Sequence, residues 1–96
     1  MTDAETLETT LQQDHPGIDV RLERFRNDDR VIDIRWNTHF IVVLWNSNDG
    51  FKIWDVPPNE AWGNFSDPAD KEARTVDDAR NFLNQLLALP STKKSA

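Results

Sequence analysis

The 96-residue chain contains no cysteine, no tyrosine, three glycines and two histidines. Without cysteine it cannot form disulfides, thiolate metal sites or cysteine nucleophiles. Three isolated glycines do not make a phosphate-binding glycine loop. No apolar run approaches the roughly 18 residues that a membrane-spanning helix requires. These absences exclude several classes of enzyme and membrane protein.

The length is enough for one domain with its own core. We predict a single domain over residues 1–90, followed by a disordered polar tail at 91–96. The first ten residues, MTDAETLETT, are acidic and lack the apolar core of a signal peptide, which predicts a cytoplasmic location.

The segment Phe40–Val56 predicts a β-hairpin on which the rest of the chain packs. Phe40–Trp45 is apolar at every position, Asp49-Gly50 supplies turn residues, and Phe51–Val56 forms the return strand. A loop at 47–50 pairs Leu44 with Ile53. Strand alternation then gives one face with Phe40, Val42, Leu44, Phe51 and Ile53, and a second face with Ile41, Val43, Trp45, Lys52, Trp54 and Val56.

Two strands and two helices complete the prediction. Residues 18–26 and 31–36 alternate like half-buried strands, and a loop at 37–39 pairs Trp36 with Phe40 and Ile34 with Val42. Capping boxes begin helices at Thr2 and Thr75. The predicted fold is α+β in the order α-β-β-β-β-α, a four-stranded antiparallel meander with both helices packed on the face of Ile18, Ile34, Val42 and Ile53.

Catalytic and metal-binding patterns are absent from the sequence. His15 and His39 are the two imidazole bases, and we expect both in solvent-exposed loops. A calcium loop around Asn48-Asp49-Gly50 fails, because its first and twelfth positions fall on Trp45 and Val56. We therefore predict a protein that is not an enzyme and that has no catalytic residues, metal or cofactor.

The net charge is −6, and residues 55–78 carry seven acidic side chains against two basic ones. Such a field favours basic partners and repels phosphate backbones, although the same charge also keeps a small protein in solution.

The leading hypothesis is a non-catalytic protein-interaction domain that occupies a basic surface of a partner protein. Stoichiometric inhibitors, immunity proteins and phage-type antagonists act in this way. Either the aromatic second face is covered by the 57–70 loop through Trp62 and Phe65, or it is open to a partner or to a homodimer. The predicted partner-binding residues are Arg35, Trp45, Lys52, Trp54, Glu60, Trp62, Asp67, Asp70 and Glu72.

Two other binding functions are alternatives. A small-molecule pocket between the 57–70 loop and the sheet would be lined by Trp45, Trp54, Trp62 and Phe65. Single-stranded nucleic acid could stack on the sheet face. The element order resembles that of double-stranded RNA-binding domains, but four strands are expected here and the last helix begins with the acidic sequence Thr75-Val76-Asp77-Asp78. Direct nucleic-acid binding is therefore not expected.

Overall fold

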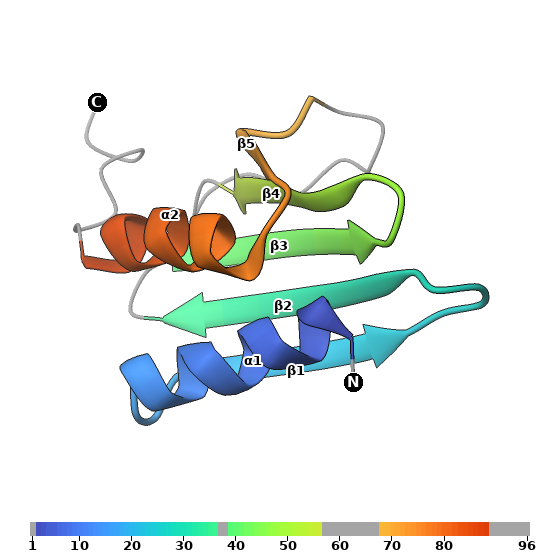
Figure 1. Cartoon of the computed structure of the whole chain (residues 1–96). Coiled ribbons are helices and arrows are strands. Elements are labelled where there is room, and N and C mark those ends of the chain that lie inside the picture. Colours follow the sequence, from blue (N-terminus) through green and yellow to red (C-terminus); the bar gives the residue numbers. More distant parts are fainter. Residues whose placement is uncertain (1, 37–38, 57–67, 89–96) are drawn as a thin grey trace.

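The computed structural model describes residues 2–36, 39–56 and 68–88. Within these residues, two helices and five strands form an α+β fold with one antiparallel sheet, whose strands neighbour each other in sequence order (Figure 1). The elements are α1 (Asp3–Asp14), β1 (Asp19–Arg24), β2 (Arg30–Trp36), β3 (His39–Asn46), β4 (Gly50–Val56), β5 (Lys71–Ala73) and α2 (Val76–Ala88). The predicted α+β class is confirmed, and the predicted count of four strands is wrong by one.

The additional strand, β5, is held in place by contacts at both of its ends. The Asp70 N–H donates to the Ile53 carbonyl at 2.9 Å, and the Asp70 carboxylate accepts from the Asp55 N–H at 2.7 Å. Gly50 has a φ of +76°, and a Cβ there would lie 2.6 Å from the Ala73 carbonyl oxygen. Glycine is therefore required where β4 begins beside β5.

Both helices begin at a threonine cap, as predicted. Thr2 and Glu5 form the full capping box of α1, in which each side chain accepts from the backbone N–H of the other residue. At α2 the Thr75 hydroxyl accepts from the Asp78 N–H at 3.1 Å. These caps satisfy backbone donors that a helix leaves unpaired at its first turn.

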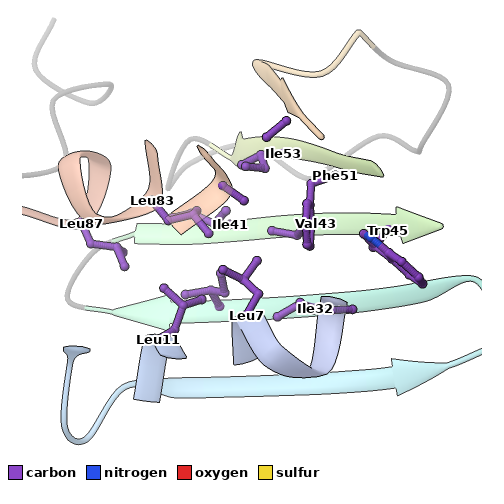
Figure 2. Packing of buried hydrophobic residues seen from close by; sticks show 14 of the residues in the cluster. Leu7, Leu11, Ile32, Ile41, Val43, Trp45, Phe51, Ile53, Leu83 and Leu87 are labelled. Carbon is purple, nitrogen blue, oxygen red and sulfur yellow. The ribbon is translucent and has the colours of Figure 1, made fainter. Parts of the chain in front are cut away.

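The main core lies between the helices and one face of the sheet (Figure 2). Leu7 and Leu11 of α1 and Leu83 and Leu87 of α2 are buried on this face. The two helices also contact each other, because the Arg80 guanidinium forms two hydrogen bonds with the Asp14 carboxylate, at 2.8 and 2.9 Å. Both helices lie on one face of the sheet, as predicted, but Val42, which the prediction placed on that face, is buried on the other.

The predicted pairing of β3 is wrong by one residue on both sides. Val43 rather than Leu44 lies opposite Ile53, and Ile41 rather than Val42 lies opposite Ile34. Each connecting loop is one residue shorter than predicted, with residues 47–49 between β3 and β4 and only positions 37 and 38 between β2 and β3. A one-residue shift turns every side chain of a strand to the other face. Hence the faces of β3 are exchanged: Ile41, Val43 and Trp45 face the helices, and Phe40, Val42 and Leu44 face away.

Candidate interaction face of the sheet

The sheet face turned away from α1 and α2, here called the outer face, combines a charged half with an apolar half. Strand alternation and the observed pairing place these residues on it: Asp19, Arg21 and Glu23 of β1; Val31, Asp33 and Arg35 of β2; Phe40, Val42 and Leu44 of β3; Lys52, Trp54 and Val56 of β4; and Glu72 of β5. Charges dominate β1 and β2, and apolar side chains dominate β3 and β4.

The charged half surrounds a hollow of about 330 Å³, here called the charged hollow. Its lining residues are Asp19, Arg21, Glu23, Asp33 and Arg35. Opposite charges face each other across the two strands, since Asp19 pairs with Arg35 and Arg21 with Asp33. Along β1 the Arg21 Nε also lies 3.6 Å from the Asp19 carboxylate. The hollow is thus an alternating array of three acidic and two basic side chains.

Asp33 is the electrostatically perturbed member of the charged hollow. Partial burial raises the pKa of its carboxyl group, and the nearby negative charge of Glu23 raises this pKa further, while Arg35 and Arg21 act in the opposite direction. Among the described residues, neither Asp33 nor Glu23 forms a salt bridge. A cation placed in the hollow would therefore stabilise the ionised form of Asp33.

The apolar half of the outer face is a small second core. Val31, Val42 and Val56 are buried, and Phe40 and Leu44 pack against them while keeping part of their surface exposed. The halves meet where the Arg35 guanidinium carbon lies 4.7 Å from the centre of the Phe40 ring, within the range of a cation–π contact.

Four of the predicted partner-binding residues lie together on the outer face. They are Arg35, Lys52, Trp54 and Glu72, and Lys52 is directly opposite Glu72 across β4 and β5. Trp54 is only 4% exposed, so its indole offers little free surface. The prediction that Trp45 shares this face is wrong: Trp45 is 8% exposed on the helix side, where its ring lies 6.4 Å from that of Phe51.

Asp70 does not join this set. Asp70 caps the junction of β4 and β5 through the hydrogen bonds described above, which is a structural role. Glu60, Trp62, Phe65 and Asp67 lie outside the described residues. Because Trp45 and Trp54 occupy opposite faces of the sheet, they do not both line the predicted small-molecule pocket. The pocket itself stays a prediction, since residues 57–67 lie outside the described residues.

The site prediction missed Asp19, Arg21, Glu23 and Asp33, which line the charged hollow with Arg35. Their alternation with apolar residues in 18–26 and 31–36 already predicted a common face. The additional signal was the alternation of charge sign along each strand, which becomes an ordered array when two such strands pair.

Both histidines are less exposed than predicted. His39 begins β3 and is 6% exposed. His15 Nε2 lies 2.8 Å from the Asn84 side-chain oxygen, and the His15 ring lies 5.6 Å from that of Trp36. Within residues 2–36, 39–56 and 68–88, no group of three or more His, Asp or Glu side chains is arranged to hold a metal ion.

None of the helices in the described ranges has the length and apolar character needed to cross a bilayer. No protein-family model, curated protein or solved structure matches this chain.

Proposed function

We propose that the protein is a non-catalytic interaction domain that binds a basic partner protein through the outer face, with the charged hollow as the recognition element. The observation that carries this proposal is the pair of carboxylates on Glu23 and Asp33, which have no salt bridge among the described residues. The cytoplasmic location expected from the sequence is part of this proposal.

A partner arginine or lysine is the group that best fits the charged hollow. Entering between Glu23 and Asp33, it would give these carboxylates a salt-bridge partner, and an arginine fork can bond a carboxylate through two hydrogen bonds. The Phe40 ring and the Leu44 side chain, both partly buried, lie beside the charged hollow and would contact apolar groups of the same partner. Arginine and aromatic side chains are enriched at protein interfaces.

The net charge of −6 supports the same class of partner. It attracts basic surfaces over long range and speeds their association, an effect that weakens as salt is added. This chemistry fits the role of a stoichiometric inhibitor, which would bind and block a basic functional surface of its partner protein.

The perturbed Asp33 carboxyl predicts that binding depends on pH. Its pKa is raised in the free protein, and a bound cation would lower it. Binding is therefore coupled to loss of the Asp33 proton, and affinity should rise with pH across the range in which Asp33 titrates.

The test is a titration of the isotope-labelled protein with a short arginine-rich peptide, followed by NMR chemical shifts. We expect the largest shifts on the outer face of β1 and β2, and Asp33→Asn should weaken binding by about 2- to 10-fold and remove its pH dependence. Glu8→Gln on α1, which changes the charge equally on the helix side, is the matched control. Shifts confined to other surfaces, or equal losses in both variants, would refute the proposal.

A further inference from the structure

Strand β1 forms one edge of the sheet and is the longer of its two edge strands. It pairs with β2 along one side, and no described strand pairs with its other side (Figure 1). The opposite edge, β5, has three residues, whereas β1 has six. A long edge with unpaired backbone groups is a template for another strand.

The backbone groups available on β1 follow from its pairing with β2. At the closed end of this hairpin the Phe25 N–H donates to the Asp29 carbonyl at 3.1 Å, so Phe25 directs its N–H towards the β2 side. Alternate residues of an antiparallel strand bond alternate neighbours. The residues that direct their N–H and C=O groups away from β2 are therefore Val20, Leu22 and Arg24.

We propose that a second copy of this chain pairs with β1 in antiparallel orientation, with Leu22 opposite Leu22 of the second copy. The two sheets then form one continuous sheet about a twofold axis, with all helices on the same side. Val20 pairs with Arg24 of the second copy and Arg24 with Val20, so all three outward-directed residues exchange backbone hydrogen bonds. On the outer face, Arg21 lies opposite Glu23 of the second copy, and this pair occurs twice.

Charge selects this alignment over its neighbours. With Arg21 at the axis, two arginines face each other and Asp19 faces Glu23 of the second copy, so every charged pair repels. With Val20 at the axis, Asp19 would face Arg21, but the pairing would need the Ile18 N–H, which already donates to the His15 carbonyl at 2.9 Å. Of these three alignments, only the one on Leu22 combines opposite charges with a full set of backbone donors.

The apolar groups at this edge support an occupant with apolar side chains. Val20 and Leu22 belong to the main core but are only partly buried. Phe25, just beyond β1, is 50% exposed and is the one large hydrophobic side chain that is exposed among the described residues. In the proposed dimer, Leu22 is covered by its own counterpart, and Phe25 lies diagonally across from Arg21 of the second copy, a favourable aromatic–cation neighbour.

Charge-reversed variants test this pairing without any other ligand. The wild-type chain should show a concentration-dependent shift from monomer to dimer in sedimentation velocity between about 1 μM and 1 mM. Arg21→Glu places like charges in both symmetric pairs, and so does Glu23→Arg. Each variant alone should weaken the dimer by about tenfold or more.

An equimolar mixture of the two variants provides the decisive measurement. Position 21 of the Arg21→Glu copy then meets position 23 of the Glu23→Arg copy with opposite charge, and the second symmetric pair is also attractive. We expect a heterodimer in the mixture and monomers in each separate sample, with far-UV circular dichroism showing that both variants are folded. A wild-type chain that stays monomeric to about 1 mM, or a mixture that stays monomeric, would overturn the proposal.

This inference goes beyond the proposed function, and the two share Glu23, which would contact the bound cation in one and faces Arg21 of the second copy in the other. They are nevertheless tested separately. The dimer is measured with the chain alone, whereas the peptide titration reads Asp33 of β2, which makes no edge pair in the dimer. Failure of either experiment leaves the other interpretable.

Discussion

Adjacent residues in β3 should respond in opposite ways to the same substitution. Val43 is fully buried against the helices, whereas Leu44 lies half-buried on the outer face opposite Lys52. We therefore predict that Val43→Glu unfolds the protein and that Leu44→Glu is tolerated. The comparison tests the strand pairing on which the outer face depends.

The magnitudes follow from burial. Removing the Val43 side chain forfeits about 1.5–3 kcal/mol of apolar burial. A carboxylate placed there without a partner costs several kcal/mol more. Their sum approaches the roughly 5–15 kcal/mol that stabilises a domain. For Leu44→Glu, the loss of partial burial is about 1 kcal/mol, and a new cross-strand pair with Lys52 returns about 0.2–1 kcal/mol.

Urea unfolding followed by tryptophan fluorescence and circular dichroism measures both effects. The midpoint of Leu44→Glu should lie within about 1 M of the wild-type value, whereas Val43→Glu should lack a folded baseline at 25 °C. Leu44→Lys is the matched control, because it loses the same apolar surface but faces Lys52 with like charge and should be the less stable of the two Leu44 variants. A folded Val43→Glu together with an unfolded Leu44→Glu would show that the faces of β3 are reversed.

Three further predictions concern the helices and β5. The hydrogen bond from Arg80 lowers the pKa of Asp14 from 3.8 to about 2. The ionised Asp14 carboxylate therefore stabilises the fold above pH 3.8, and this stabilisation is lost as the pH falls towards 2. The urea midpoints of the wild type and Asp14→Asn should converge over that pH range. Gly50→Ala should destabilise the fold by about 1–3 kcal/mol, because Gly50 has a positive φ and a Cβ there would meet the Ala73 carbonyl. Hydrogen exchange at β5 should accelerate in this variant. Unchanged exchange would contradict the packing of Gly50 against β5. Leu83→Ala should cost about 2–5 kcal/mol in urea unfolding, since this side chain is fully buried between α2 and the sheet, and a cost under about 1 kcal/mol would argue against that placement.

Elements with strong local signals could be predicted from the sequence. The Thr2–Glu5 capping box marks the start of α1, and the helical spacing of apolar residues marks α2. In β4 the charged Lys52 distinguishes one side of the strand from the other, so Lys52 and Trp54 were assigned to the correct face.

The faces of β3 and the presence of β5 could not be predicted in this way. Phe40–Trp45 is apolar at every position, so its pattern does not show which side chains face the helices. The predicted pairing depended instead on the two loop lengths, each of which was predicted one residue too long. Lys71–Ala73 has no alternation and no β-branched residue; its pairing comes from Asp70 and Gly50, which act only once the chain has folded. The predicted position of Trp45 is wrong because it depended on the pairing of β3, whereas the alternation predicted for residues 18–26 and 31–36 is observed in β1 and β2.

The link between α1 and α2 has a consequence for the order of folding. Each neighbouring strand pair from β1 to β4 joins segments that are close in sequence, whereas Arg80 and Asn84 reach Asp14 across 66 and 70 residues. Contacts between distant residues form late, because closing a long loop costs entropy before any contact is gained. During synthesis, the hairpins can assemble before α2 is available to complete the core around Leu7 and Leu11. The chain therefore exposes apolar surface until α2 is made, and that interval is when it is most vulnerable to aggregation.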